Sequence, residues 1–234
     1  MPITTAIILA GGLGTRLREA VPDLPKPMAP IANRPFLEYQ LDYWIDQGIN
    51  RFILSVGYLK DKIIDHFGRE YKNCSIEYAV EYEPLGTGGA VLLAAKGLTE
   101  PFLILNGDTF IEVNLENLYK FHLKKKSDLT FSLFKTSQLD RYMGMKIGLN
   151  NEILKLKIKI KEESGFANGG VYLITPKALS FLAYKQGCRI SFEDELLPSI
   201  LSNNDMSLYG MECKGKFIDI GIPDDFYRAE KILT

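Results

Sequence analysis

The first half of the chain alternates short apolar, β-rich runs with segments of helical periodicity. The strand candidates are residues 5–10, 52–56, 76–80 and 102–105. Residues 35–48, with Leu37, Leu41 and Trp44 on one face, and residues 62–67 form helical segments between them. Strands separated by helices pair in parallel, and the helices then cover both faces of the sheet. We therefore predict an α/β fold with a mixed, mostly parallel β-sheet flanked by helices.

The second half has strand-like runs with less helix between them. These runs are residues 129–134, 145–147, 154–160 and 171–174. They indicate mixed or antiparallel additions to the same sheet. Helices near 176–184 and 193–201 precede a strand at 217–220 and a closing helix from Asp224. No repeat or linker marks a domain boundary, so we predict a single Rossmann-like domain over residues 1–234.

Charge and composition exclude several classes of partner. The 234 residues carry a formal net charge of -1 and lack the basic field that supplies non-specific nucleic-acid affinity. No apolar stretch approaches the roughly 18 residues needed to cross a bilayer, and the N-terminal run is too short for a signal peptide. Cys74, Cys188 and Cys213 show neither metal-ligand nor disulfide spacing, which fits a reducing compartment. We predict a cytoplasmic protein without nucleic-acid or membrane partners.

The first strand leads directly into a glycine-rich turn, Leu9-Ala10-Gly11-Gly12-Leu13-Gly14-Thr15-Arg16-Leu17. Glycines let successive backbone N–H groups converge on phosphate oxygens. The turn matches neither the Walker A motif nor the dinucleotide fingerprint, because Leu17 stands where a third small residue belongs. Arg16 adds a fixed cation and bidentate donor, which suits a triphosphate. We predict a phosphate site; the alternative is a turn that only connects strand to helix.

A lysine lies between two prolines in Pro25-Lys26-Pro27-Met28. The prolines stiffen the backbone and are expected to deny the segment a helix. Lys26 is thereby presented as a point charge that could stabilise a phosphoryl group in transfer. The alternative is an ordinary surface lysine in a proline loop.

Two aspartates follow apolar strands. Asp108 comes after the strand candidate that ends at 105, and Asp219 lies within Phe217-Ile218-Asp219-Ile220-Gly221. Ligands of open α/β sheets gather at the carboxyl ends of strands. Two such carboxylates could share a hard cation with phosphate oxygens and waters, and Mg²⁺ fits that set of ligands. Capping or turn-forming aspartates are the alternative.

The motif L-A-G-G-L-G-T-R-L followed by P-K-P resembles the signature of the sugar-phosphate nucleotidyltransferases, also called nucleoside-diphosphate-sugar pyrophosphorylases. The resemblance runs from Ile7 to about Asp225. It implies the nucleotidyltransferase fold and an enzyme that joins a nucleoside triphosphate to a sugar 1-phosphate, with Arg16, Lys26 and Asp108 catalytic. It implies that Asp108 and Asp219 hold Mg²⁺. The nucleotide-binding residues would be Leu9, Ala10, Gly11, Gly12, Gly14, Thr15, Arg16, Lys26, Glu81, Gly86, Thr87 and Asp108.

Residues 81–90 combine a strand end, a turn and a glycine-rich helix start. In relatives with a similar segment, the positions of Glu81 and Gly86 line the base pocket. A carboxylate could accept hydrogen bonds from guanine N1–H and the 2-amino group, a pattern that uracil and thymine lack. This favours GTP. A connection with solvated glutamates is the alternative.

The C-terminal half, residues 128–234, is expected to bind the sugar phosphate, and residues 1–127 the nucleotide. Four alternating lysines, Lys155, Lys157, Lys159 and Lys161, would share one face of a strand. By spacing to Gly165 the resemblance selects Lys159, with Lys157 and Lys161 left open. Asn168, Gly169 and Glu193 resemble sugar contacts. The rival interpretations are a strand bulge and a carboxylate at a helix start.

Three segments, residues 21–31, 34–39 and 163–172, resemble bacterial D-glycero-D-manno-heptose 1-phosphate guanylyltransferases. The resemblance implies synthesis of GDP-D-glycero-D-manno-heptose from GTP and the heptose 1-phosphate, for capsule polysaccharide. Mannose 1-phosphate guanylyltransferase and glucose 1-phosphate thymidylyl- or uridylyltransferase stay open. Alternatives from other classes are a non-catalytic nucleotide-sugar sensor and an NAD-binding oxidoreductase. A homo-oligomer also stays open.

Overall fold

Four parallel strands of the first half form the centre of the sheet. They are β1 (Thr5–Leu9), β4 (Arg51–Val56), β6 (Cys74–Val80) and β7 (Phe102–Asn106). The computed structural model describes residues 3–12, 14, 17, 21–138, 141–157, 165–182 and 185–234. The strand order is β7-β1-β4-β6, so β1 lies between the second and the last of these strands in the sequence. The winding direction reverses between β1 and β7, where open α/β sheets bind ligands.

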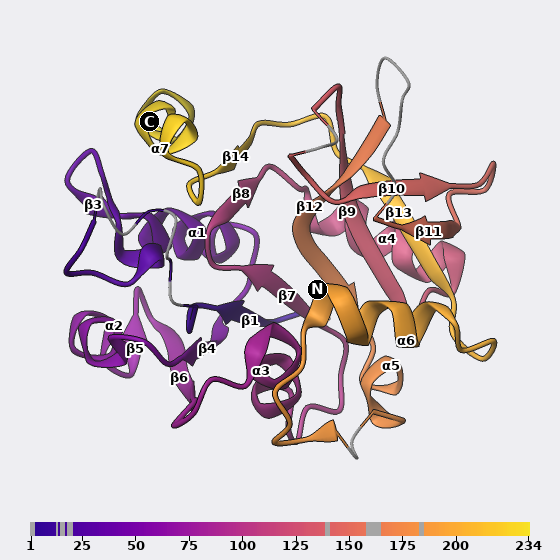
Figure 1. Cartoon of the computed structure of the whole chain (residues 1–234), viewed down its shortest axis with the longest axis horizontal. Coiled ribbons are helices and arrows are strands. Elements are labelled where there is room, and N and C mark those ends of the chain that lie inside the picture. Colours follow the sequence, from indigo (N-terminus) through magenta and orange to yellow (C-terminus); the bar gives the residue numbers. More distant parts are fainter. Residues whose placement is uncertain are drawn as a thin grey trace.

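The second half extends the same sheet. The long strand β12 (Gly165–Ile174) pairs antiparallel with β7 and with β9 (Leu129–Thr136), which pairs in parallel with β13 (Leu208–Glu212). The remaining strands of the sheet are β5 (Glu70–Tyr71), β10 (Gly144–Ile147) and β11 (Ile153–Leu156). Figure 1 shows the strands of the second half gathered on the side of the molecule opposite α2 and β6, whereas β5 lies beside β6. The expected mixed, mostly parallel sheet is confirmed.

Helices cover both faces of the sheet. One face carries α1 (Phe36–Ile45), α2 (Lys60–Phe67) and α4 (Leu115–Lys125), and the other carries α3 (Gly86–Ala94), α5 (Lys177–Ser180) and α6 (Leu197–Leu201). In Figure 1, α3 and α6 lie in front of the sheet and α4 lies behind it. Alternating strand residues serve the two layers, because Ile8 packs with the first set and Ile7 with the second.

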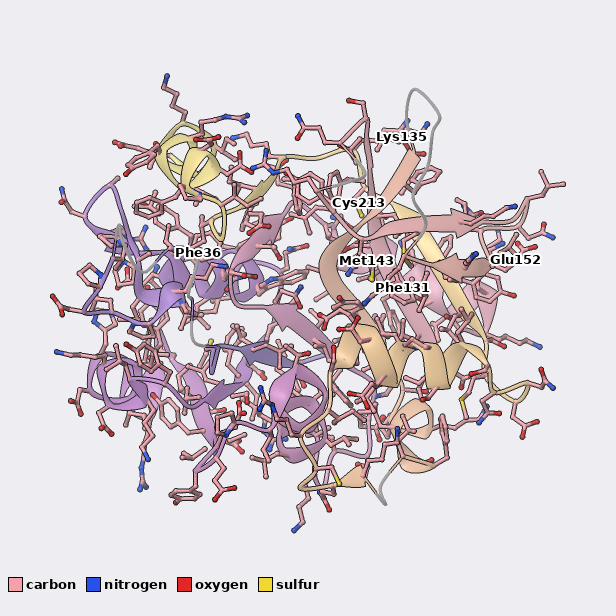
Figure 2. All side chains as sticks on the ribbon, viewed as in Figure 1. Phe36, Phe131, Lys135, Met143, Glu152 and Cys213 are labelled. Carbon is pink, nitrogen blue, oxygen red and sulfur yellow. The ribbon has the colours of Figure 1, made fainter. Side chains whose placement is uncertain are left out.

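A third, smaller apolar cluster lies beside the sheet. There β8 (Thr109–Ile111) pairs antiparallel with β14 (Phe217–Asp219), and β2 (Pro30–Ile31) pairs with β3 (Arg34–Pro35). The closing helix α7 (Pro223–Leu233) packs against both pairs through Ala229. Figure 2 shows Phe36 of this cluster well apart from Phe131 in the core of the second half. Within the described part of the chain, every helix is too short or too polar to span a bilayer.

The prediction that the two prolines deny a helix around Lys26 is wrong for one turn. A 3-10 turn, η1 (Lys26–Met28), forms there. Its hydrogen bonds run from Met28 N to Pro25 O (2.7 Å) and from Ala29 N to Lys26 O (3.0 Å). Neither bond needs the missing N–H of Pro27, so a single turn is compatible with the proline.

The strand predicted over residues 154–160 is shorter than expected in its described part. It begins at Ile153 and ends at Leu156, and Lys157 has a positive φ of 54°. A residue in the left-handed region cannot continue a β-strand. Lys157 therefore does not share a strand face with Lys155, contrary to the prediction from the alternation of lysines. Residues 158–164, which include Lys159 and Lys161, lie outside the described residues.

Candidate active site

A cavity of about 730 Å³ opens where the winding direction reverses, at the carboxyl ends of β1 and β7. We refer to it as the switch-point cavity. Its volume suits a small-molecule ligand of nucleotide size. The predicted site residues that line it are Leu9, Ala10, Gly11, Gly12, Gly14, Lys26, Glu81, Gly86, Thr87, Asp108 and Glu193. The fold therefore brings residues from both predicted halves of the site to one place.

Three predicted site residues, Thr15, Arg16 and Lys159, lie outside the described residues. Lys157, left open as the lysine that contacts the sugar phosphate, is ion-paired with Asp194. Lys155 is exposed on β11.

Asn168 and Gly169 are not among the residues that line the cavity. The amide of Asn168 donates to the buried hydroxyl of Tyr172 at 2.6 Å. A Cβ on Gly169 would lie 2.6 Å from Cδ1 of Ile111 and 3.0 Å from the hydroxyl of Ser132. Packing against Ile111 of β8 and Ser132 of β9 thus accounts for the glycine. Sugar contacts at both positions stay predictions.

Lys26 and Asp108 line one edge of the cavity, and Asp219, which is not among its lining residues, lies beside them. Lys26 Nζ lies 2.5 Å from Asp108 Oδ2, and the lysine side chain is only 9% exposed. Asp219 is held beside them because the Ile220 N–H donates to the Asp108 carbonyl at 2.9 Å. Lys26 Nζ and Asp219 Oδ1 both lie against the position that a Cβ on Gly221 would take. The pairing of β8 with β14 therefore brings together two carboxylates and an ammonium group from three distant segments.

The two carboxylates suit a divalent metal in their chemistry. The described residues contain no group of three or more His, Cys, Asp or Glu side chains that could hold a metal ion by themselves. Mg²⁺ commonly binds through one or two carboxylates and completes its shell with waters and substrate phosphates. The ammonium group of Lys26 against Asp108 shows that this edge already attracts a cation. Asp108 and Asp219 thus fit a magnesium ion that arrives with a nucleotide.

The glycine loop is shaped by its neighbours. A Cβ on Gly11 would lie 2.5 Å from Glu81 Oε1, so any larger residue there would collide with this carboxylate. Gly14 has a φ of +57°, a conformation that costs residues with a Cβ roughly 1 kcal/mol or more. Both observations explain glycine at these positions and leave backbone exposed toward the cavity.

Glu81 is held at the end of β6 by two hydrogen bonds. Its Oε1 accepts from Ser55 Oγ at 3.2 Å, and its Oε2 accepts from Leu85 N at 3.0 Å. Burial raises the pKa of Glu81 above its usual range, and the two donors oppose that shift. Each carboxylate oxygen has a second lone pair, so Glu81 retains capacity to accept hydrogen bonds from a ligand.

Thr87 joins the two predicted halves of the site. Its hydroxyl donates to Glu193 Oε2 at 2.9 Å and accepts from Phe192 N at 2.8 Å. The segment that precedes Glu193 is fixed to the start of α3, because Gly88 N donates to Ile190 O at 2.8 Å. Glu193 is thereby oriented by the helix that begins the predicted base pocket.

Sequence reasoning did not select ten residues that line the cavity, namely Pro27, Gly57, Tyr58, Tyr82, Glu83, Pro84, Ala90, Asn106, Gly107 and Arg189. Asn106 ends β7 two residues before Asp108, and Arg189 precedes Glu193 by four residues. Their proximity to predicted site residues was the available signal. Tyr58 follows β4, whose carboxyl end meets that of β1, so strand order alone could have placed it there.

A family model described as "Nucleotidyl transferase" matches residues 5–234. The chain belongs to the nucleotidyl transferase family. It is 44% identical over 229 residues to a D-glycero-alpha-D-manno-heptose 1-phosphate guanylyltransferase of Aneurinibacillus thermoaerophilus, with 97% of each chain covered. It is 37% identical to the protein with the same description from Campylobacter jejuni, covering 95% of this chain and 96% of that one.

The fold of this nucleotidyl transferase also has close structural relatives. It superposes on the crystal structure of HddC from Yersinia pseudotuberculosis with a TM-score of 0.86 at 34% identity, over 99% of this chain and all of that one. A second structure of HddC, complexed with GMP-PN, gives a TM-score of 0.85 with the same identity and coverage. The predicted fold and the predicted class of enzyme are confirmed.

Proposed function

We propose that this nucleotidyl transferase joins GTP to D-glycero-α-D-manno-heptose 1-phosphate, forming the GDP-activated heptose and pyrophosphate. The arrangement of Lys26, Asp108 and Asp219 at the switch-point cavity is the observation that carries the reaction type. The heptose and the guanine base are supported by the descriptions of two relatives at 44% and 37% identity. The product would be an activated sugar for polysaccharide assembly, as in a capsule.

The reaction needs no protein nucleophile. An oxygen of the sugar phosphate forms a bond to the α-phosphorus of GTP, and the bond from that phosphorus to the oxygen bridging to the β-phosphate breaks. Pyrophosphate leaves with the bonding electron pair. A phosphate monoester has its second pKa near 6 and is already anionic at neutral pH, so no base is required to activate it. The protein contributes positioning and neutralisation of charge.

Residues of the cavity divide these tasks. Lys26, fixed by Asp108 and largely buried, supplies positive charge beside the phosphates. The backbone of the loop through Gly11, Gly12 and Gly14 supplies N–H donors, with Arg16 as the cation predicted from sequence. Asp108 and Asp219 would hold a magnesium ion, which when bound offsets negative charge on the phosphate oxygens. Glu81 would accept from guanine, and Glu193 from sugar hydroxyls.

A substrate screen tests this proposal. Pyrophosphate release is measured for GTP, ATP, UTP and dTTP, each with heptose 1-phosphate, mannose 1-phosphate and glucose 1-phosphate. We expect the highest kcat/KM for GTP with the heptose phosphate. Higher kcat/KM with UTP or dTTP would contradict the guanylyl assignment, and higher kcat/KM with mannose 1-phosphate would contradict the heptose. Binding of GTP without pyrophosphate release from any pair would instead indicate a nucleotide-sugar sensor.

A further inference from the structure

A buried glutamine lies directly behind the turn that carries Asp108. Gln40 belongs to α1, is 3% exposed, and shares the buried face of that helix with Leu37, Leu41 and Trp44. Its Nε2 donates to the carbonyl of Asn106 at 2.8 Å and to the carbonyl of Thr109 at 2.6 Å. These two carbonyls flank Gly107 and Asp108, so one side-chain amide bonds to both ends of the turn.

Two further backbone groups of the turn are bonded to residues of other segments. Gly107 N donates to Leu9 O at 3.1 Å, and Asp108 O accepts from Ile220 N at 2.9 Å. All four residues of the turn are therefore anchored, with both carbonyls at its ends depending on Gln40. Asn106, Gly107 and Asp108 of the turn line the cavity, and the Asp108 carboxylate is ion-paired there with Lys26.

The orientation of the Gln40 amide follows from its surroundings. With the amide reversed, Oε1 would face the two carbonyl oxygens, and because all three are acceptors no hydrogen bond could form among them. The observed orientation leaves Oε1 buried and without a hydrogen-bond partner among the described residues. Burying an unpaired acceptor is unfavourable, so the two donated bonds outweigh that cost at this position. An apolar residue would fit the helix face better if core packing were the only requirement.

We propose that Gln40 is a positioning residue for the metal-binding carboxylate Asp108. This inference rests on the proposed function, in which Asp108 and Asp219 hold the divalent ion. Gln40 fixes both ends of the 106–109 turn and so sets the position of the Asp108 carboxylate relative to Asp219 and the nucleotide phosphates. Residues that orient a metal ligand from behind typically change metal affinity about 10- to 100-fold when they are removed.

The test measures binding of Mn²⁺, a paramagnetic probe for the Mg²⁺ site, by electron paramagnetic resonance. The full-length protein is titrated in the presence of GTP and without sugar phosphate. Gln40→Met retains the length of the side chain and removes the donor. We expect it to weaken Mn²⁺ binding about 10- to 100-fold. We also expect faster amide hydrogen exchange in the peptide spanning residues 102–111.

Gln47→Met is the matched control. Gln47 follows the same helix, and its Oε1 accepts from Leu115 N at 2.7 Å, away from the Asp108 turn. We expect this control to leave Mn²⁺ affinity unchanged even if it lowers the melting temperature. If Gln40→Met does not fold, Gln40→Asn, whose amide is one methylene too short to reach both carbonyls, is expected to show the same loss of Mn²⁺ affinity.

Asp108→Asn separates the two hypotheses. If Asp108→Asn weakens Mn²⁺ binding while the folded Gln40 variant binds as tightly as wild type, the positioning role is wrong and the proposed function stands. If Asp108→Asn itself binds Mn²⁺ normally, the metal role of Asp108 is wrong, and the positioning role of Gln40 fails with it.

Discussion

At the scale of single residues, Glu81 is the side chain that we propose contacts the base, and the fold holds it in place. It reaches the cavity from the end of β6, lies against Gly11, and accepts hydrogen bonds from Ser55 and Leu85. Each of its carboxylate oxygens has a second lone pair, so Glu81 retains capacity to accept hydrogen bonds from a ligand while both internal bonds stay in place. We therefore propose that this carboxylate distinguishes the base of the nucleotide.

Glu81→Gln should reduce the preference for GTP. The variant keeps the shape of the side chain but loses the charge and replaces one acceptor with a donor, so guanine N1–H and the 2-amino group lose a charge-assisted partner. We expect kcat/KM for GTP to fall about 10- to 100-fold, as for loss of a hydrogen bond to a charged group. The measurement is the ratio of kcat/KM for GTP to that for UTP.

Glu77→Gln provides the control for this change. Glu77 lies on the same strand, is half exposed, and pairs with Arg51 on the surface. Its substitution should leave the ratio of GTP to UTP as in wild type. An unchanged ratio in Glu81→Gln as well would show that Glu81 does not read the base.

At the scale of elements, the four central strands of the first half and helices α1 and α2 were predictable because each has a single clear periodicity. No range was predicted for helix α4, although Asn114 caps it by accepting from Asn117 N and its buried residues include Leu115, Leu118 and His122. Most residues of this helix are polar, so its apolar residues give only a weak helical periodicity in the sequence. The strand at 154–160 was overextended because alternation of lysine with aliphatic residues carries no sign of the positive φ at Lys157.

Buried His122 of α4 predicts how stability depends on pH. Its ring bonds to Thr130 Oγ1 at 2.8 Å, and burial lowers the pKa of His122 to about 4. The unfolded chain, with a histidine pKa near 6.5, binds more protons between these values, so stability is lost as pH falls from about 6.5 toward 4. From this group alone we expect a loss of about 1.4 kcal/mol between pH 7.5 and pH 5.5.

Urea denaturation of wild type and His122→Leu at pH 7.5 and pH 5.5 measures that contribution. The variant is less stable at pH 7.5 because it loses the bond to Thr130, but its stability should decline less between the two pH values. Equal declines in both proteins would contradict a neutral, buried His122.

At the scale of the whole molecule, the site is assembled by the order of the strands. The glycine loop and Asp108 were predictable as neighbours, because the carboxyl ends of parallel strands share one edge of a sheet. The proximity of Asp219 to Asp108 was not predictable from periodicity, because it depends on the antiparallel pairing of β14 with β8; its place after an apolar strand and the resemblance to a family indicated only its role. Gln40 gave no signal either, since one polar residue on an apolar helix face does not disturb the pattern.

The central claim is that Asp108 and Asp219 serve one ion beside Lys26. Pyrophosphate release from GTP and the heptose phosphate, measured at saturating Mg²⁺ for Asp108→Asn, Asp219→Asn and the double variant, tests it most directly. Groups that act as a unit are strongly non-additive, so each single variant should lose on the order of 1,000-fold in kcat and the double variant little more. The exposed Asp46 supplies the control variant, Asp46→Asn, which should retain full activity. Near-normal pyrophosphate release by either single variant would contradict the shared ion. So would a fold loss of kcat in the double variant equal to the product of the two single fold losses.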